Sequence, residues 1–402
     1  MAPPPRRAAA ILRDVRGGAK LAIDGVQGVT GIVETMHRRI ARLAPPLGTV
    51  RDAPMGGITG FVYRRVRGTM AFVGKALDVA LATAETIAAR TSPAQLDSNA
   101  TTPAADAFVS ALNGVVGDHL ERTGNPLAIP MQLKEREALA ATTASGGTRV
   151  LLLVHGLCMT DSQWTRDGHD HGEALARSLG YAAVYARYNT GRHVSANGRE
   201  LAIALERWAA TRPASMDELA IVGHSMGGLV ARSALHHAIE ARMTWPSTVR
   251  QLIFLGTPHH GAPLEKAGNW VHAALGVSPY AEPLSRLSGL RSAGITDLRF
   301  GNLLEADGSL DRFAHRDNRQ AAPLPKGIAC YAIAGSLDSA AANAIAGDGL
   351  VPVASALGRH EKTTRDLHIP ASNTWIARGV GHLDLLASRA VYGRIHRWLK
   401  AS

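Results

Sequence analysis

Hydrophobic residues in the first part of the chain recur at alternating spacings of three and four. The series is Leu12, Val15, Ala19, Ala22, Val26, Val29, Val33, Met36 and Ile40. Such spacing places these side chains on one face of a helix. A second series follows the Pro- and Gly-rich residues 44–57 and comprises Val62, Val66, Val73, Leu77, Ala84 and Ile87. We therefore predict a helical hairpin that ends in a linker, together residues 1–104.

From residue 105 onward, short apolar runs alternate with helical periods. Strands are predicted at residues 128–133, 149–154, 181–186, 219–222, 251–255, 328–334 and 374–380. Helices are predicted at about residues 108–121, 170–179, 197–210, 227–241 and 385–399. This alternation indicates an α/β domain over residues 105–402, with a doubly wound, mostly parallel sheet. Residues 257–325 interrupt it as a long insertion, and insertions at the carboxyl ends of strands usually cover an active site.

The charge of the chain is concentrated near its N-terminus. The formal net charge is +11, of which residues 1–100 carry +7 from 14 basic and 7 acidic side chains. The predicted hairpin could therefore dock on an anionic membrane or granule surface, or pack on the main domain or on a second copy. Basic residues are not interleaved with aromatics and show no zinc-finger spacing, so we expect no nucleic-acid partner.

Cysteine usage and apolar runs bear on the compartment. Cys158 and Cys330 do not make a disulfide framework and fit a reducing environment. No apolar stretch typical of a secretory signal follows the first residues. The longest charge-free run, residues 267–281, is too short to span a bilayer. We expect a cytoplasmic protein, with any membrane contact peripheral.

The motif Gly223-His-Ser-Met-Gly227 carries the clearest chemical signal. It follows an apolar strand pattern and precedes a helical one, as a serine nucleophile on a sharp strand-to-helix turn requires. In such a strained turn, side chains at positions 223 and 227 would collide with their surroundings, so both are glycine. Ser225 is therefore the predicted nucleophile.

A serine nucleophile needs a base, and the base needs an acid to orient it. His382 is the histidine between the last predicted strand and the last predicted helix, where the chain order of serine, acid and histidine places the base. Two acids follow the strand at 328–334, namely Asp338 and Asp348. We favour Asp348 because the turn Gly347-Asp-Gly-Leu-Val can hold its carboxylate rigidly.

The tetrahedral intermediate of acyl transfer needs two backbone N–H donors. We predict those of Met226, after the nucleophile, and of Leu157, in the loop after the strand at 149–154. In that loop, His155 is expected to brace the backbone by a hydrogen bond. Cys158 is interpreted as a buried small side chain, because a serine already occupies the nucleophile position.

Five motifs together resemble the α/β-hydrolase superfamily, and within it bacterial lipases and PGAP1-like deacylases. They are His155-Gly-Leu157, Gly223-His-Ser-Met-Gly227, Gly256-Thr-Pro-His-His-Gly261, Gly347-Asp-Gly-Leu-Val351 and Gly381-His-Leu-Asp384. The resemblance covers residues 149–400 and implies that Ser225, Asp348 and His382 form the triad. It also implies that Leu157 and Met226 form the oxyanion hole. His259 and His260 are interpreted as structural.

These observations predict a serine carboxylic-ester hydrolase that acts on a lipid or other apolar ester without a cofactor or metal. The insertion would then form a helical lid and acyl-chain pocket, with Trp270, Val271, Leu275, Val277 and Leu284 among its apolar residues. Acyl transfer to an alcohol, or deacylation of phospholipid or polyester at a surface, are the alternatives. Asp384 matches a calcium ligand of some lipases, but with no second carboxylate near it we expect it at the N-terminus of the last helix.

Overall fold

The computed structural model describes residues 13, 16–18, 20, 103–136, 147–212, 215–262, 292–308, 317–338 and 347–401. The chain divides into two compact units, one of Met1–Thr102 with Leu120–Ala128 and one of Pro103–His119 with Ile129–Ser402. Within the first unit, the Asn125 side chain donates a hydrogen bond from Nδ2 to the Gly17 carbonyl over 3.0 Å. The predicted hairpin lies almost wholly outside the described residues, so the hairpin, its partners and the boundary at residue 104 stay predictions.

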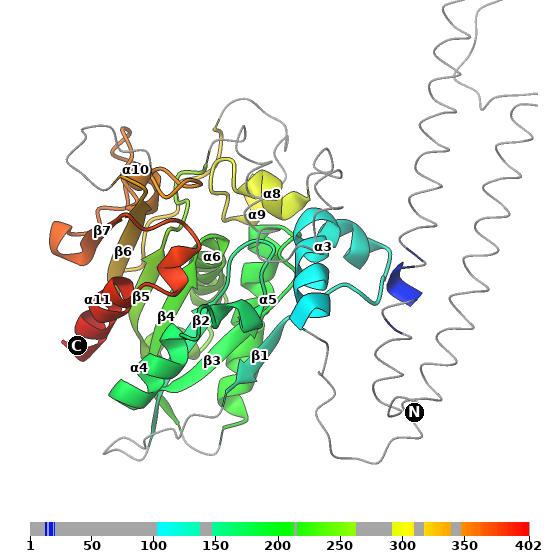
Figure 1. Ribbon diagram of the computed structural model, residues 1–402, viewed down its shortest axis with the longest axis horizontal. Coiled ribbons are helices and arrows are strands. Elements are labelled where there is room, and N and C mark those ends of the chain that lie inside the picture. The colour runs from blue at the N-terminus through cyan, green and yellow to red at the C-terminus, as the bar shows by residue number, and fades with distance from the viewer. Residues whose placement is uncertain are drawn as a thin grey trace, which may run out of the picture. The chain divides into compact units, whose positions relative to one another are not determined.

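The second unit contains a sheet of seven described strands in the order β1-β3-β2-β4-β5-β6-β7 (Figure 1). These are β1 (Gln132–Glu135), β2 (Thr148–Val154), β3 (Ala182–Arg187), β4 (Met216–His224), β5 (Val249–Leu255), β6 (Ala329–Ser336) and β7 (Thr374–Arg378). Only the edge pair of β1 and β3 is antiparallel among the described strand pairs. The mostly parallel sheet predicted from the alternation is therefore confirmed.

The first predicted strand begins later than expected. The sequence pattern placed it at residues 128–133, whereas β1 starts at Gln132. The Ile129 amide donates a hydrogen bond to the Asn113 side chain over 3.0 Å, and Pro130 has no N–H to donate. This stretch is therefore held by the preceding helix rather than by the sheet.

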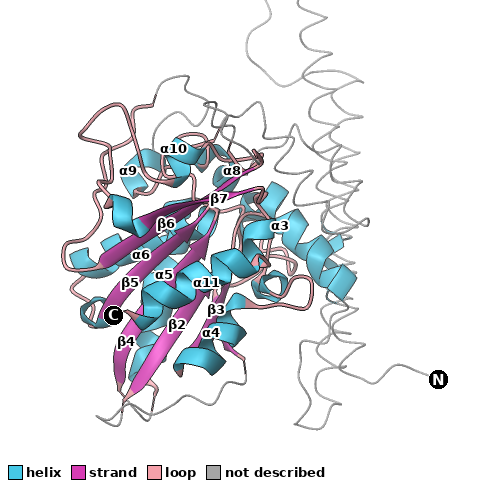
Figure 2. Cartoon of the chain, turned by 60° about the vertical axis from the view of Figure 1, so that its left-hand side comes forward, coloured by secondary structure: helices cyan, strands magenta, loops and turns pink. Residues whose placement is uncertain are grey.

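Helices cover both faces of the sheet (Figure 2). The longer ones are α3 (Pro103–Arg122), α4 (His171–Leu179), α5 (Val194–Ala210), α6 (Met226–Glu240) and α11 (Arg389–Lys400). The shorter ones are η1 (Asp161–Trp164), η2 (Trp245–Thr248), α8 (Ala293–Asp297), α9 (Glu305–Gly308), α10 (Val353–Ala356), η5 (Ala371–Asn373) and η6 (Asp384–Leu386). With α4 and α11 on one face and α5 and α6 on the other, the sheet is doubly wound as predicted. None of the described helices has the length and apolarity to cross a membrane.

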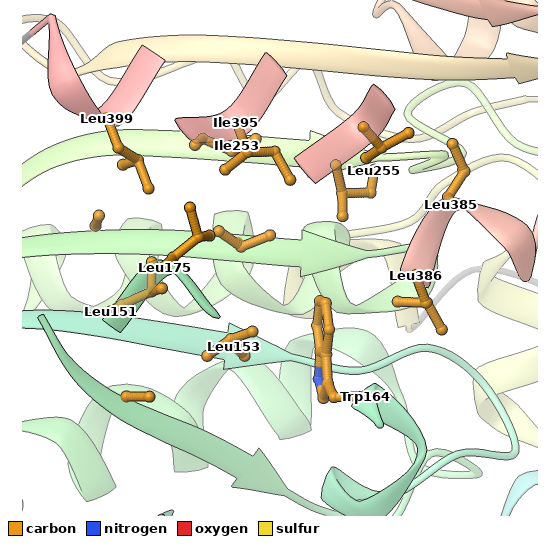
Figure 3. Close-up of a cluster of buried hydrophobic side chains, with 14 of the residues drawn as sticks. Leu151, Leu153, Trp164, Leu175, Ile253, Leu255, Leu385, Leu386, Ile395 and Leu399 are labelled. Carbon is orange, nitrogen blue, oxygen red and sulfur yellow. The ribbon is translucent and has the colours of Figure 1, made fainter. Parts of the chain in front are cut away.

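The core between the sheet and α11 fixes the strands that carry the site. Leu153 of β2 and Leu255 of β5 are fully buried in one cluster with Leu385 and Ile395 from the C-terminal segment (Figure 3). Burying a side chain of this size stabilises the fold by about 1.5–3 kcal/mol. The carboxyl ends of the strands are therefore a rigid platform.

The predicted insertion lies between β5, which ends at Leu255, and β6, which begins at Ala329. Its described portions contain α8 and α9. The five apolar residues expected to line an acyl pocket lie at positions 270–284, outside the described residues. The lid therefore stays a prediction.

Candidate active site

Ser225 occupies a sharp turn between β4 and α6. Its φ of 56° and ψ of −127° lie where a non-glycine residue is strained. Two backbone hydrogen bonds hold the turn, because the Ser225 amide donates to the Leu255 carbonyl over 2.8 Å and its carbonyl accepts from Gly228 over 3.1 Å. The Ser225 Oγ atom is buried and has no hydrogen-bond partner among the described residues. The turn predicted from the motif is present.

The glycines around Ser225 are required by close backbone approaches. A Cβ at Gly223 would lie 2.5 Å from Gly228 Cα, and one at Gly227 would lie 2.1 Å from the Val154 carbonyl oxygen. Both distances are impossible for real side chains without moving the backbone. The spacing of glycines that marked the motif in the sequence thus has a direct steric cause.

His382 and Asp348 form a buried pair. His382 Nδ1 donates to Asp348 Oδ2 over 2.7 Å, and the His382 amide donates to the Asp348 carbonyl over 3.0 Å. The two residues are 5% and 3% exposed, respectively. The other candidate acid, Asp338, uses its amide to bond Ser336 Oγ, and the structure pairs His382 with Asp348 instead.

The turn that carries Asp348 fixes the carboxylate and keeps it charged. Asp348 Oδ1 accepts hydrogen bonds from the amides of Leu350 and Val351 over 3.0 and 2.8 Å. Burial raises the pKa of this carboxyl, but the adjacent His382 ring and the two amides outweigh burial and hold the pKa below its ordinary value. The imidazole therefore faces a carboxylate at neutral pH.

His224 is a site residue that the sequence reasoning missed. Its ring lies 4.9 Å from the His382 ring, and Nε2 is 3.0 Å from the His382 carbonyl oxygen. Burial, and then the nearby His382, lower the pKa of His224 to about 3, so the neutral ring donates this hydrogen bond. In the sequence, the feature that could have pointed to His224 is its position next to Ser225 at the end of a buried strand.

Gly256, which the sequence analysis named only as the start of a motif, also borders the pair. A Cβ at this position would lie 3.0 Å from Asp348 Oδ2 and 3.2 Å from His382 Cε1. Its φ of 58° is likewise favourable only for glycine. The motif that begins at Gly256 thus has a steric function next to the candidate site.

The loop after β2 approaches the serine closely. A Cβ at Gly156 would lie 2.9 Å from Ser225 Cβ, so glycine allows the next amide, that of Leu157, to come near the site. The other predicted donor, the Met226 amide, lies at the N-terminus of α6. Among the described residues, none accepts a hydrogen bond from either amide. The oxyanion hole itself stays a prediction.

Side chains next to this loop fix its shape. The Tyr188 hydroxyl donates to the His155 carbonyl over 2.6 Å, and the two rings stack at 4.3 Å. His155 Nδ1 lies 3.0 Å from the Gly156 carbonyl oxygen, so His155 braces the loop as expected. Cys158 is buried as expected, and burial raises the pKa of its thiol to about 12, which disfavours the reactive thiolate.

The prediction that Asp384 lies at the N-terminus of the last helix is wrong. Asp384 begins the short helix η6, whereas α11 starts at Arg389 behind Ser388, whose side chain caps the helix. The Asp384 carboxylate is exposed and lies 3.8 Å from Arg166 Nη2. Among the described residues, no cluster of three or more His, Cys, Asp or Glu side chains could hold a metal ion.

The strand order, the antiparallel edge and the serine turn after β4 together define the architecture. This strand order is consistent with an α/β-hydrolase fold. A family model described as a domain of unknown function, DUF7379, matches residues 125–282, which is less than half of the chain. No curated protein matches the chain.

Several solved structures of lipases and esterases are similar to the chain at low identity. The mature form of the Bacillus licheniformis lipase BlEst2 is 19% identical, with a TM-score of 0.44 over 67% of this chain and 98% of that one. A lipase-esterase related protein from Clostridium acetobutylicum is 14% identical, with a TM-score of 0.37 over 67% and 98%. The RedJ thioesterase of Streptomyces coelicolor is 16% identical, with a TM-score of 0.37 over 67% and 96%.

Proposed function

We propose that the protein is a serine carboxylic-ester hydrolase that acts through an acyl-enzyme on an ester with an apolar acyl group. The observation that carries this proposal is the buried 2.7 Å pair of His382 and Asp348 in a fold that also presents Ser225 on a strained turn. Ser225 follows β4, Asp348 follows β6 and His382 follows β7. Parallel strands bring their carboxyl ends to one edge of a sheet, where ligands bind.

The proposed reaction begins with attack of Ser225 Oγ on the ester carbonyl carbon. His382 Nε2 takes the hydroxyl proton as the new C–O bond forms, and Asp348 stabilises the resulting imidazolium. The bond to the leaving alcohol then breaks, and His382 returns the proton to the alcohol oxygen. Water, deprotonated by His382, attacks the acyl-enzyme and releases the acid and Ser225.

The oxyanion of each tetrahedral intermediate would accept hydrogen bonds from the Leu157 and Met226 amides. Their lack of acceptors among the described residues supports this role. Fixed donors of this kind act mainly in the transition state, and loss of one typically costs about 10²–10³ in rate.

Hydrolysis of p-nitrophenyl esters from acetate to palmitate tests the proposal, with Ser225→Ala as the key variant. We expect turnover by the wild type, a loss of at least about 10³-fold in Ser225→Ala, and unchanged turnover in the exposed-serine control Ser247→Ala. Full activity in Ser225→Ala would overturn the proposal. An added alcohol distinguishes acyl transfer from hydrolysis, because transfer yields a new ester rather than the free acid.

A further inference from the structure

A buried cation lies farther along the helix that Ser225 precedes. Arg232 is seven positions after Ser225 in the sequence, about 10 Å along α6, and is 7% exposed. Its guanidinium makes no ion pair with any carboxylate of the described residues. A buried charge without a partner is costly, so this arrangement requires an explanation outside the catalytic proposal.

The hydrogen bonds of Arg232 leave much of its guanidinium unused. Nη1 donates to His259 Nδ1 over 3.2 Å, and Nη2 donates to the Ala322 carbonyl. The remaining N–H groups of its five have no acceptor among the described residues. Burial, and then the charge of Arg319, lower the pKa of Arg232 to about 9, which still leaves it cationic at neutral pH.

The acids nearby are already engaged. Asp317 forms ion pairs with both Arg319 and Arg365. Asp307 accepts hydrogen bonds from three backbone amides, those of residues 303, 304 and 320. The cavity beside Arg232 is lined by Arg319 and Arg365 and by the carboxylates Asp307 and Asp366. Of its three arginines, only Arg232 makes no ion pair with a carboxylate of the described residues.

Two adjoining hollows share Arg232 in their walls. One is a polar cavity of about 40 Å³ that His259 and Arg319 also line. The other is a groove of about 350 Å³ along α6, with Leu235, Ile239 and Leu324 in its walls and the His236–Glu240 pair among its lining residues. Leu303, Ala322 and Pro323 line both hollows, so the two adjoin at Arg232.

We propose that the cavity and the groove together form a binding site for a fatty acid, with the carboxylate on Arg232 and the alkyl chain along Leu235 and Ile239 of α6. A carboxylate matches the fork of N–H donors on a guanidinium. The groove has the volume of a small-molecule site, and Ile239, 50% exposed, is one of two large hydrophobic side chains exposed in the described part of the chain. The proposal is independent of the role of Ser225.

Calorimetric titration of the full-length Ser225→Ala protein with dodecanoate, below its micellar concentration, tests the site. We expect binding that weakens about tenfold or more in Ile239→Glu, because a carboxylate would then lie against the apolar chain. The matched control is Leu337→Glu, because Leu337 is the other exposed large hydrophobic residue, 57% exposed and outside both hollows. It should bind dodecanoate as the parent does.

The role of the carboxylate head group is tested with two other ligands and with two variants of Arg232. Dodecyltrimethylammonium and acetate should each bind at least tenfold more weakly than dodecanoate, since one lacks the negative charge and the other the chain. Arg232→Met should weaken dodecanoate binding similarly, and Arg232→Lys should retain more affinity. If either Arg232 variant fails to fold, the Ile239→Glu variant and the ligand series still test the proposed site.

Photolabelling with a diazirine-bearing dodecanoate locates the bound chain directly. Labels on residues 235–240, 303–304 or 322–325 are expected. Labels only around residues 157, 225 and 382, equal affinity for acetate and dodecanoate, no detectable binding, or binding unchanged in Ile239→Glu would each overturn the proposal. Because the readout is binding, an inactive Ser225 leaves the result interpretable.

Discussion

Two buried histidines in this fold have charged partners, one an anion and the other a cation. His382 is 5% exposed and donates from Nδ1 to the Asp348 carboxylate, whereas His259 is 0% exposed and accepts at Nδ1 from the Arg232 guanidinium. A carboxylate stabilises an imidazolium, as a general base requires. Burial, and then the charge of Arg232, hold the pKa of His259 well below its ordinary value, so His259 stays neutral. Because both rings are buried, the carboxylate partner of His382 is what distinguishes the candidate base from the structural ring.

Removing the charge of the partner acid should have the largest effect. Asp348→Asn should lower kcat/KM for an ester by about 10³–10⁴, because the carboxylate no longer fixes the tautomer of His382 or stabilises its charge. Steady-state kinetics with p-nitrophenyl butyrate measures this. Asp338→Asn is the control and should stay within a few-fold of the wild type; an equal loss in Asp338→Asn would contradict the pairing.

Crowding the serine should have the next largest effect. In Gly156→Ala, the new methyl group would meet Ser225 Cβ at 2.9 Å and move the loop that carries the Leu157 amide. We expect kcat to fall about 10²-fold with the fold retained by circular dichroism. Gly393→Ala in α11 is the matched control, because a Cβ there meets nothing within 4 Å. Comparable losses in both variants would show that the close approach has no special role.

Acid should destabilise the fold first through its neutral histidines. Burial is the largest cause that lowers the pKa of His155 and of His171 to about 4. The unfolded chain therefore gains protons below about pH 6.5 while these rings do not, so stability falls between about pH 6.5 and 4. Each ring contributes a loss on the order of 2 kcal/mol at pH 5, or about 30-fold in the folding equilibrium.

Asp348 affects stability over a lower pH range than the histidines do, because its pKa is held below 3.8. Its contribution to folding stability is lost only as the pH falls through that depressed pKa. Urea unfolding at pH 7, 6, 5 and 4 measures the histidine range, and unfolding at pH 3 and below measures that of Asp348. His171→Gln should flatten the slope between pH 6.5 and 4. A stability that stays constant down to pH 4 would contradict the neutral state of these rings.

The smallest effect is expected at the residue that supports His382 from behind. His224→Leu removes the donor to the His382 carbonyl, 3.0 Å away, and should lower kcat about tenfold with little change in KM. The control His396→Leu, in α11 and distant in sequence, should leave both parameters unchanged. A rise in KM without a fall in kcat would show that His224 does not position the base.

Local patterns predicted much of the fold. The apolar runs identified each strand of the sheet, and the glycines at 223 and 227 identified the serine turn, because their steric cause lies within a few residues or in the adjacent strand. The antiparallel pairing of β1 could not be predicted, since it depends on a partner about 50 residues away. The last helix, α11, starts later than the predicted residue 385. The acidic residue taken as its N-terminus, Asp384, begins a separate short helix at residues 384–386.

The candidate site was predicted through chain order, which constrains which acid and which histidine follow the serine. Order could not reveal that His224 supports His382, across 158 residues, nor that Arg232 bonds a carbonyl 90 residues away and lacks an acid. Such long-range partners are set by the packing of the whole domain. They carry no local signal in sequence spacing.

The central claim is that Ser225 is a nucleophile activated by His382. Labelling of the full-length protein with a fluorophosphonate, followed by peptide mass spectrometry, tests this without choosing a substrate. We predict one modified serine, Ser225, and a labelling rate that falls at least about 10²-fold in His382→Ala. Labelling of another residue, or labelling of Ser225 at the same rate in His382→Ala, would contradict the claim.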